Sequence, residues 1–433
     1  MSLHETYYRL LILFAVVYPF LIFPFGTVYY TTVNKLVFLI VFVSVGWIIY
    51  MKKCNHSQVP PKILLESTGG KLAFLFFGLV FLSTIFSMDV ASSFIGSPRE
   101  YNGLLSWYGF LSMFIFTYHI IKSNQKYAVR IITAIVWSAT IISVYSILQQ
   151  LNLHERMPFQ KSWGLFDNPN HLGTYLVIMV LLAFTLLLMA GNKASITVYL
   201  GIILVLFLAL FYSGSRGAWL SVAICMVLYT IVVWPKKYLW KRWGVILASM
   251  LIAFSIVNVV EGGVISNRIE SITLDIKSII TEDVTNQEAE DAGSGRWGIW
   301  KKTLPFVKEN ILVGTGPSTF SQLYYSGEEA GGLDNSHNDY LEIAFSMGIP
   351  ALIVYMMLLF TVIKKGYRAA GKSDDSGQIF IYGLLITVIG YLIKTNFNIS
   401  TIAVGPYFWV VLAVLYGYAG RESFVSPESG KNV

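Results

Sequence analysis

Charged residues are scarce in this sequence. They make up 13% of its 433 residues, whereas hydrophobic residues make up 55%. A soluble protein carries about a quarter charged residues, so this deficit excludes an ordinary soluble domain. The composition instead predicts a polytopic membrane protein.

Cysteine and histidine are also too few, and too scattered, to indicate a metal site. The chain has two cysteines and six histidines. Cys54 lies in a short basic connection and Cys225 in an apolar run, so we expect no disulfide between them. No His-x-x-x-His or Cys-x-x-Cys spacing occurs, so we expect no bound metal. The segment 311–320 lacks the Gly-Lys-Ser/Thr sequence of a phosphate-binding loop, and we expect no cofactor.

Long apolar runs are what the sequence has in abundance. Many of them reach the roughly 20 residues that cross a bilayer as a helix, so we expect an all-α polytopic integral membrane protein with about 12 transmembrane helices. The first run ends in Phe-Pro-Phe rather than in small residues, which indicates an uncleaved span and not a signal peptide. The expected spans are residues 7–25, 33–51, 71–88, 103–121, 129–150, 171–190, 195–213, 217–234, 243–260, 340–363, 378–394 and 401–419.

Lysine and arginine predict how these helices are oriented. They are concentrated in alternate connections, for example 52–71, 122–130, 236–242 and 364–372. Basic connections remain in the cytoplasm, so we expect both the N and C termini to be cytoplasmic. The chain would form a single transmembrane domain, 1–433. One large extracytoplasmic loop would be inserted between helices 9 and 10, over residues 261–336.

An amphipathic helix is predicted near the end of that loop. From Arg296 onward, Trp297, Trp300, Leu304 and Val307 recur at three- and four-residue spacing, and lysines occupy other positions. Such a helix would lie on the membrane interface or against the helix bundle.

A polar stretch with a histidine, residues 334–340, leads into the tenth predicted span. His337 lies beside a carboxylate and two amides, where it could transfer a proton. The N-terminal end of the helix dipole would favour its neutral form, whereas Asp339 would favour its charged form, so the net effect stays open. Ser336 and Asp339 also fit a capping pattern, in which the serine hydroxyl accepts a backbone N–H of the first turn. We expect Asn338 and Asp339 to contact a substrate beside His337.

Three arginines stand at predicted extracytoplasmic positions. Arg216 lies between small residues where two apolar runs meet, and Arg296 and Arg99 lie beside glycines. A guanidinium near membrane depth is costly unless an anion meets it, and its planar fork suits a phosphate. The alternative is an arginine that extends to lipid headgroups or to water.

A further polar cluster precedes the sixth predicted span. Asp167, Asn168, Asn170 and His171 surround a proline, and we expect them to bind substrate. The alternative is local, because Asn-Pro-Asn forms turns and Asp167 or Asn170 could cap the helix. A weaker signal comes from the polar residues at 394–398.

Arginines and a histidine at one membrane face suit a lipid diphosphate donor. The arginines would bind the diphosphate and stabilise the charge that develops on it, and the histidine would deprotonate an acceptor hydroxyl. No pair of carboxylates at helical spacing suggests a metal set, so a metal-free mechanism fits.

These polar clusters resemble motifs of the O-antigen ligase and Wzy-type polymerase superfamily. The motifs are Phe-Asp-Asn-Pro-Asn-His-Leu-Gly, Ser-Gly-Ser-Arg-Gly-Ala-Trp-Leu, Gly-Ser-Gly-Arg-Trp and Asn-Ser-His-Asn-Asp-Tyr-Leu-Glu, in that order. The resemblance runs from about Arg99 to the last span. It implies about twelve membrane helices and a large extracytoplasmic loop before the helix that opens with the key histidine.

The resemblance also implies an activity. That activity is metal-independent, inverting transfer of a glycan from undecaprenyl diphosphate to an acceptor hydroxyl. It would take place at the extracytoplasmic face of the bacterial inner membrane. Arg216 and Arg296 would hold the diphosphate and His337 would activate the acceptor. The partners implied are the lipid-linked donor, a glycan or other hydroxyl acceptor and the bilayer, with no nucleic acid. Ligases and polymerases share these motifs, so the acceptor stays open.

Two other classes of function remain as alternatives. A transporter or flippase for lipid-linked glycans would suit twelve helices and a basic cavity, but it should place charges near the middle of several spans. A receptor or scaffold would use the long loop as its binding surface, and only the acidic stretch at 282–291 favours it.

Overall fold

The computed structural model describes residues 3–21, 31–54, 67–98, 100–151, 161–263, 265–268, 270, 295–325 and 335–420. Over these residues the chain forms helices joined by turns and irregular segments, with no strand. The expected all-α fold is confirmed in this sense. Of the predicted loop 261–336, only parts lie among the described residues.

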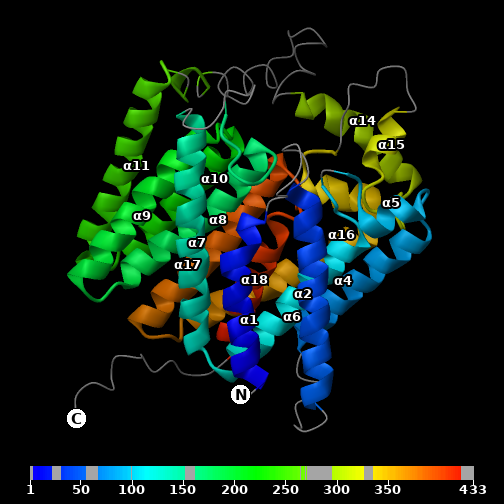
Figure 1. Ribbon diagram of the computed structural model, residues 1–433, viewed down its shortest axis with the longest axis horizontal. Coiled ribbons are helices and arrows are strands. Elements are labelled where there is room, and N and C mark those ends of the chain that lie inside the picture. The colour runs from blue at the N-terminus through cyan, green and yellow to red at the C-terminus, as the bar shows by residue number, and fades with distance from the viewer. Residues whose placement is uncertain are drawn as a thin grey trace.

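Figure 1 shows the helices in their order along the chain. Their bounds are α1 (Leu3–Val17), η1 (Tyr18–Phe20), α2 (Thr31–Cys54), α4 (Thr68–Ile85), α5 (Val90–Ile95), α6 (Leu104–Ser123), α7 (Lys126–Gln150), α8 (Pro169–Met189), α9 (Lys193–Tyr212), α10 (Arg216–Val233), η3 (Lys237–Leu239), α11 (Trp240–Val260), α14 (Arg296–Glu309), α15 (Phe320–Tyr325), α16 (Asp339–Ala370), α17 (Asp375–Lys394), η4 (Thr395–Phe397) and α18 (Gly405–Tyr418).

Ten helices in the described part of the chain are long and apolar enough to cross a membrane. They are α2, α4, α6, α7, α8, α9, α10, α11, α16 and α17. The first and last predicted spans correspond to α1 with η1, and to α18, which are shorter. α18 begins at Gly405 because Pro406 fits the first turn of a helix, where no amide donor is needed. The number twelve and the orientation stay predictions.

The core of the bundle surrounds α8, which is buried almost along its whole length. α8 packs against α17, α9 and α10, while α18 packs on α6 and α16 packs on α4. Every residue of α18 is buried as well. Helices that are apolar on all sides belong in such an interior. The surrounding helices instead expose apolar side chains, including Val37, Leu251 and Val259, as a lipid-facing surface would.

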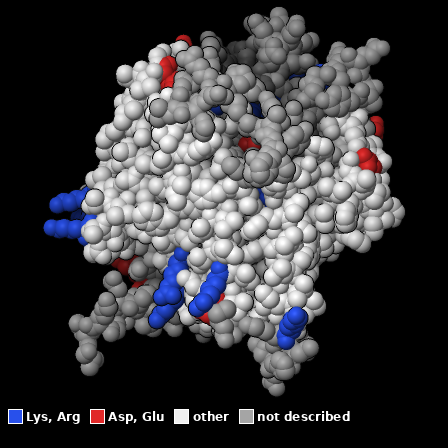
Figure 2. All heavy atoms as spheres, viewed as in Figure 1, with Lys and Arg blue, Asp and Glu red and all other residues white. Residues whose placement is uncertain are grey.

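The two ends of the bundle differ. α8, α10 and α16 begin at one end, which we call the His337 end. α1 begins and α18 ends at the other, where Tyr127 at the start of α7 bonds to Glu5 and Gln125 bonds to the Tyr418 carbonyl. In Figure 2 the basic side chains of the visible face gather toward this opposite end, and the middle of the face is largely uncharged.

The glycine-containing segment 311–316 packs against a kink in α16. Gly348 interrupts the helix with a φ of 85°. The freed groups find partners in the segment, because Thr315 and Gly316 donate their amides to the carbonyls of Phe345 and Ser346, at 3.0 and 2.9 Å. A Cβ on Gly348 would collide with the Leu312 carbonyl. The loop segment therefore fixes the first part of α16, where the polar motif lies.

The predicted amphipathic helix exists as α14, but it buries a different face. Ile299, Thr303 and Val307 are its buried positions and pack near Phe345 of α16. Trp297 is 37% exposed and Leu304 is 50% exposed, so these two residues lie on another face, and the membrane-interface position allowed for that stripe stays a prediction. Thr303 can be buried because its hydroxyl bonds to the Ile299 carbonyl at 2.7 Å.

Candidate active site

His337 lies in a tight polar turn just before α16. Its φ is 52°, which places it in the left-handed region that few residues other than glycine adopt. The turn holds itself in this shape, because the His337 amide donates to Asn335 Oδ1 at 2.8 Å and the Ser336 amide donates to Glu342 Oε2 at 2.9 Å. Such strain costs on the order of 1–3 kcal/mol and concentrates at functional sites.

Asn338, and not Ser336, caps α16. Its side chain accepts from the amides of Tyr340 and Leu341, both at 3.1 Å. The Ser336 hydroxyl instead donates to the Asn338 carbonyl at 3.0 Å. The predicted serine cap was therefore wrong, because asparagine two residues later reaches the same first-turn amides. The cap accounts for Asn338 without a substrate.

Asp339 points into the protein toward the segment before α18. It is 2% exposed, and its carboxylate accepts from the Ser400 amide at 2.7 Å and from the Ser400 hydroxyl at 2.8 Å. The expected substrate contact of Asp339 stays a prediction, and this geometry favours a residue that positions α16 against residues 398–401.

Replacing Asp339 with alanine should lower the free energy of unfolding by about 2–3 kcal/mol, because it orphans a buried amide and a hydroxyl together. Ser400→Ala should cost less, about 1 kcal/mol, since the amide contact remains. Denaturant titration of the detergent-solubilised protein measures both. Unchanged stability in Asp339→Ala, with lost activity, would instead favour a direct substrate contact.

Two further contacts bring other segments to the His337 turn. Asn335 donates its side-chain amide to the Glu100 carboxylate, and Glu100 is buried. Arg99, the predicted binding residue beside it, lies outside the described residues. Trp300 of α14 donates its indole N–H to the Ser336 carbonyl at 3.0 Å. Arg296 is one helical turn before Trp300, so this bond brings the start of α14 to His337.

Arg216 is the first residue of α10 and lies close to the start of α8. Ser215 donates its hydroxyl to Asn170 Oδ1 at 3.1 Å. Gly173 lets the two segments approach, since a Cβ there would lie 2.6 Å from the Ser215 Cβ. The 167–171 cluster and Arg216, separated in sequence, are therefore neighbours.

The four polar residues of that cluster divide into different roles. Asn168 caps α8 by accepting the Asn170 amide at 2.7 Å, so the helix is capped from this cluster but by neither Asp167 nor Asn170, the two residues weighed above. His171 is buried and lies within electrostatic range of His337 and Lys394. Asp167 has a φ of 57° and lies near the buried Lys35, which bonds to the Leu165 carbonyl at 2.7 Å.

Cations from four segments converge on the same end. Burial lowers the pKa of Lys161, and three arginines lower it further: Arg268, Arg216 and Arg296. Burial and then Arg216 likewise lower the pKa of Arg268, which donates to the Gly214 carbonyl at 2.8 Å. Repulsion among these groups is costly in a medium of low dielectric, and a polyvalent anion would offset it.

Lys394 adds a buried cation at the end of α17. It is 1% exposed, and its charged neighbours are Arg296 and His171. Within the described residues no hydrogen bond or carboxylate partner accompanies its amine. A buried amine without a counter-ion is costly to charge, so an anion bound beside Lys394 would stabilise its protonated form.

Sequence reasoning ranked Lys394 low and missed Lys161, Arg268 and Lys35. Lys161 and Arg268 lie in connections without any motif, so no local signal could have identified them. The same reasoning did select Arg216, Arg296 and His337, which the fold brings to one end. In the described ranges no group of three or more His, Cys, Asp or Glu is placed to hold a metal ion.

Comparison with known proteins bears on the same segment. The family model described as O-antigen ligase matches residues 200–356, a stretch that contains Arg216, Arg296 and His337. A comparison with curated proteins gives no match. Over this stretch the chain is similar to the O-antigen ligase family, and its described part has ten helices long and apolar enough to cross a membrane.

Proposed function

We propose that this protein transfers a glycan from undecaprenyl diphosphate to an acceptor hydroxyl on the extracytoplasmic face of the bacterial inner membrane. The observation that carries the proposal is the convergence of cations beside a histidine at the start of α16. The end product is either a completed surface glycan or a longer chain of repeat units.

The donor diphosphate occupies the cationic cluster in this proposal. The guanidinium groups of Arg216 and Arg296 each donate two hydrogen bonds to its oxygens, and the amine of Lys394 adds a further positive charge. As the bond between the sugar and the diphosphate breaks, negative charge grows on the leaving oxygen. Positive groups already in place stabilise that charge without having to reorganise.

His337 acts on the acceptor. Its neutral imidazole takes the proton of the acceptor hydroxyl while the oxygen attacks the anomeric carbon, and the lipid diphosphate leaves. A single displacement from the opposite side inverts the anomeric configuration. This displacement needs a base and an anion-binding site, and it needs no metal and no redox partner. Arg99 stays a predicted additional contact to the diphosphate.

The extracytoplasmic location is supported by charge. The His337 end carries the polar motifs, and the short basic connections lie at the opposite end of the helices, where Figure 2 shows basic side chains on the visible face. Because basic connections remain in the cytoplasm, His337 would face outward. Cysteine labelling from outside, at an exposed position such as Lys308→Cys, tests this orientation.

An assay with purified protein separates an enzyme from a transporter. Protein in detergent micelles is mixed with a lipid-diphosphate-linked glycan and an acceptor, and the products are separated by size. We expect new glycosidic bonds and released lipid diphosphate. Unchanged glycans, together with translocation of the donor across a reconstituted vesicle, would overturn the proposal in favour of a flippase.

Lys394→Met should weaken use of the donor by about tenfold or more, because it removes a charge-assisted contact to the diphosphate from a buried position. The effect should appear mainly in the KM for the donor. Lys161→Met, on the more exposed side of the cluster, serves as the comparison and should lose less. Unaltered donor kinetics in Lys394→Met would exclude this lysine from the anion site.

A further inference from the structure

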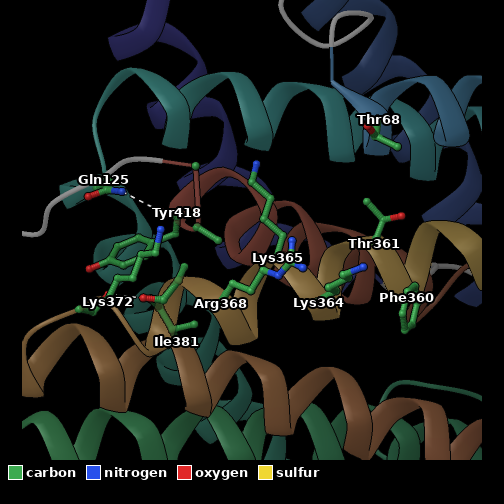
Figure 3. Close-up of a pocket in the computed structure, with 14 residues that line it drawn as sticks. Thr68, Gln125, Phe360, Thr361, Lys364, Lys365, Arg368, Lys372, Ile381 and Tyr418 are labelled. Atoms are coloured by element: carbon green, nitrogen blue, oxygen red, sulfur yellow. Dashed lines mark hydrogen bonds between the residues drawn. The ribbon is translucent and has the colours of Figure 1, made fainter.

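A second cationic site lies at the end of the bundle remote from His337. There a cavity of about 500 Å³ opens between the last turns of α16, the start of α17 and the end of α18. Figure 3 shows basic side chains of α16 directed into it. Its basic lining residues are Lys364, Lys365, Arg368 and Lys372.

Two ammonium groups meet at one wall of this cavity. Lys122 and Lys365 donate to the carbonyls of Gly420 and Tyr416, both at 3.2 Å. Their nitrogens lie 3.0 and 3.2 Å from the position that a Cβ on Gly420 would take. The last carbonyls of α18 explain these two lysines locally, since cations stabilise a helix C-terminus. They leave the wall strongly positive.

The other three cations have no such local explanation. Lys364, Arg368 and Lys372 are exposed, and within the described residues none of them makes an ion pair or a hydrogen bond. Lys364 contacts only the ring of Phe360, at 5.5 Å from its centroid. Among the residues that the structure describes, no carboxylate lines the cavity.

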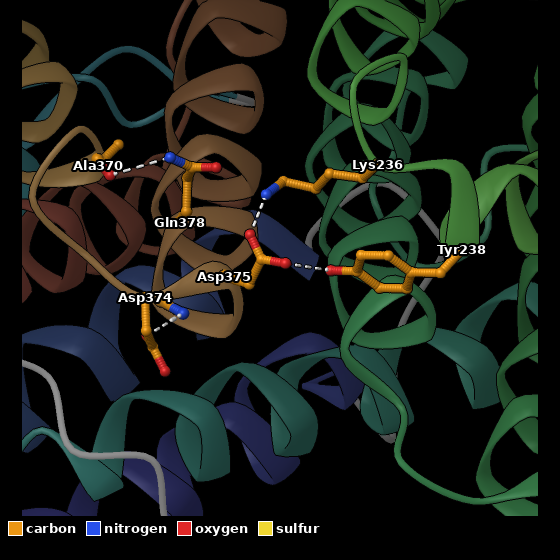
Figure 4. A network of polar contacts seen from close by, with 7 residues as sticks. Lys236, Tyr238, Ala370, Asp374, Asp375 and Gln378 are labelled. Atoms are coloured by element: carbon orange, nitrogen blue, oxygen red, sulfur yellow. Dashed lines mark hydrogen bonds and ion pairs between the residues drawn. The ribbon is translucent and has the colours of Figure 1, made fainter.

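Two acidic residues at the start of α17, Asp374 and Asp375, are engaged elsewhere (Figure 4). Asp375 pairs with Lys236 and accepts from the Tyr238 hydroxyl at 3.0 Å. Asp374 lies within electrostatic range of Tyr418, but its carboxylate caps α17 by accepting the Gly377 amide at 2.9 Å. Neither carboxylate therefore forms an ion pair with a basic residue that lines the cavity.

An apolar stripe on α16 leads into the cavity. Ile353, Met357 and Phe360 are exposed, and Phe360 is 64% exposed. Lys364 and Arg368 continue the same stripe at helical spacing, where they follow Phe360 by four and eight residues. An apolar track that ends in cations matches a lipid, with its acyl chain along the track and its phosphate at the end.

We propose that this cavity binds the phosphodiester headgroup of an anionic phospholipid from the adjacent leaflet. Lys364, Arg368 and Lys372 contact the phosphate, and the stripe from Ile353 to Phe360 holds an acyl chain. The proposal is independent of glycan transfer, and its test does not measure transfer.

Native mass spectrometry of the intact protein in detergent tests it, with phosphatidylglycerol as the probe. The triple variant Lys364→Gln, Arg368→Gln, Lys372→Gln should raise the Kd for one bound phosphatidylglycerol about 10- to 100-fold. The matched control, Lys193→Gln, Lys237→Gln, Lys241→Gln, removes the same charge from exposed residues that do not line the cavity, and its Kd should stay within about twofold.

Three results would overturn the proposal. They are an equal loss in both triple variants, equal binding of zwitterionic phosphatidylethanolamine, or displacement of phosphatidylglycerol by millimolar inorganic phosphate. The last would assign the cavity to a free phosphate compound instead. Should the triple variant fail to fold, the single change Arg368→Glu replaces it, and unchanged binding there contradicts the proposal as well.

Discussion

Replacing His337 with asparagine should slow glycan transfer by about 100- to 10,000-fold, the contribution expected of a general base. Asparagine is the informative substitution because it tolerates the left-handed backbone of this position, where φ is 52°. The turn should therefore survive while the imidazole is lost. The turnover rate should fall, and the KM for the lipid-linked donor should change little, because His337 acts on the acceptor.

A second substitution isolates the chemistry from the fold. His337→Gly also suits a positive φ and leaves a space where the ring was. Added imidazole should restore part of the activity of this variant, and it should do nothing for His337→Asn, in which the side chain occupies the space. Activity within a few-fold of the original in both variants, with unchanged thermal unfolding, would exclude His337 as the base.

Replacing Arg216 with methionine should reduce transfer by about 100- to 1,000-fold, as removal of a preorganised stabilising group does. Arg216→Lys should recover only part of this, because an ammonium cannot fork onto two phosphate oxygens. Transfer kinetics with donor titration measure both the rate and the KM, and both should worsen, unlike in His337→Asn.

Arg130 offers a matched control for Arg216. It is exposed on α7, away from the His337 end, and Arg130→Met should leave transfer within about twofold. Methionine keeps the length of the stem in both variants. An Arg216→Met protein that folds and transfers at the original rate would place the diphosphate elsewhere.

The sequence predicted the helices well because hydropathy is a local property. Every expected span overlaps a helix in the described part of the chain, and α18 begins later than expected since Pro406 belongs in a first turn. A cap for α8 from the 167–171 cluster was also among the weighed alternatives, although Asn168 forms it rather than Asp167 or Asn170. Caps depend on residues within three positions of one another, so the sequence contains most of what decides them.

The sequence decided less where two local arrangements were both possible, as with two capping residues or two faces of a helix. Ser336 and Asn338 are both good capping residues, and the φ of His337 between them decides that Asn338 reaches the amides. On α14 the tryptophans suggested one apolar face, but α16 covers the face with Thr303, whose hydroxyl is satisfied within its own helix. Neither choice is visible from residue types alone.

The sequence by itself determined that the chain is a membrane protein with long apolar helices. It also singled out His337, Arg216 and Arg296 as candidate active-site residues. Those are matters of composition and of rare side chains at helix ends. Only the tertiary structure decided that Lys394 joins them and that Asp339 turns away toward Ser400. The reason is physical: burial and charge-to-charge distance depend on which helices pack together, and no spacing along the chain records that.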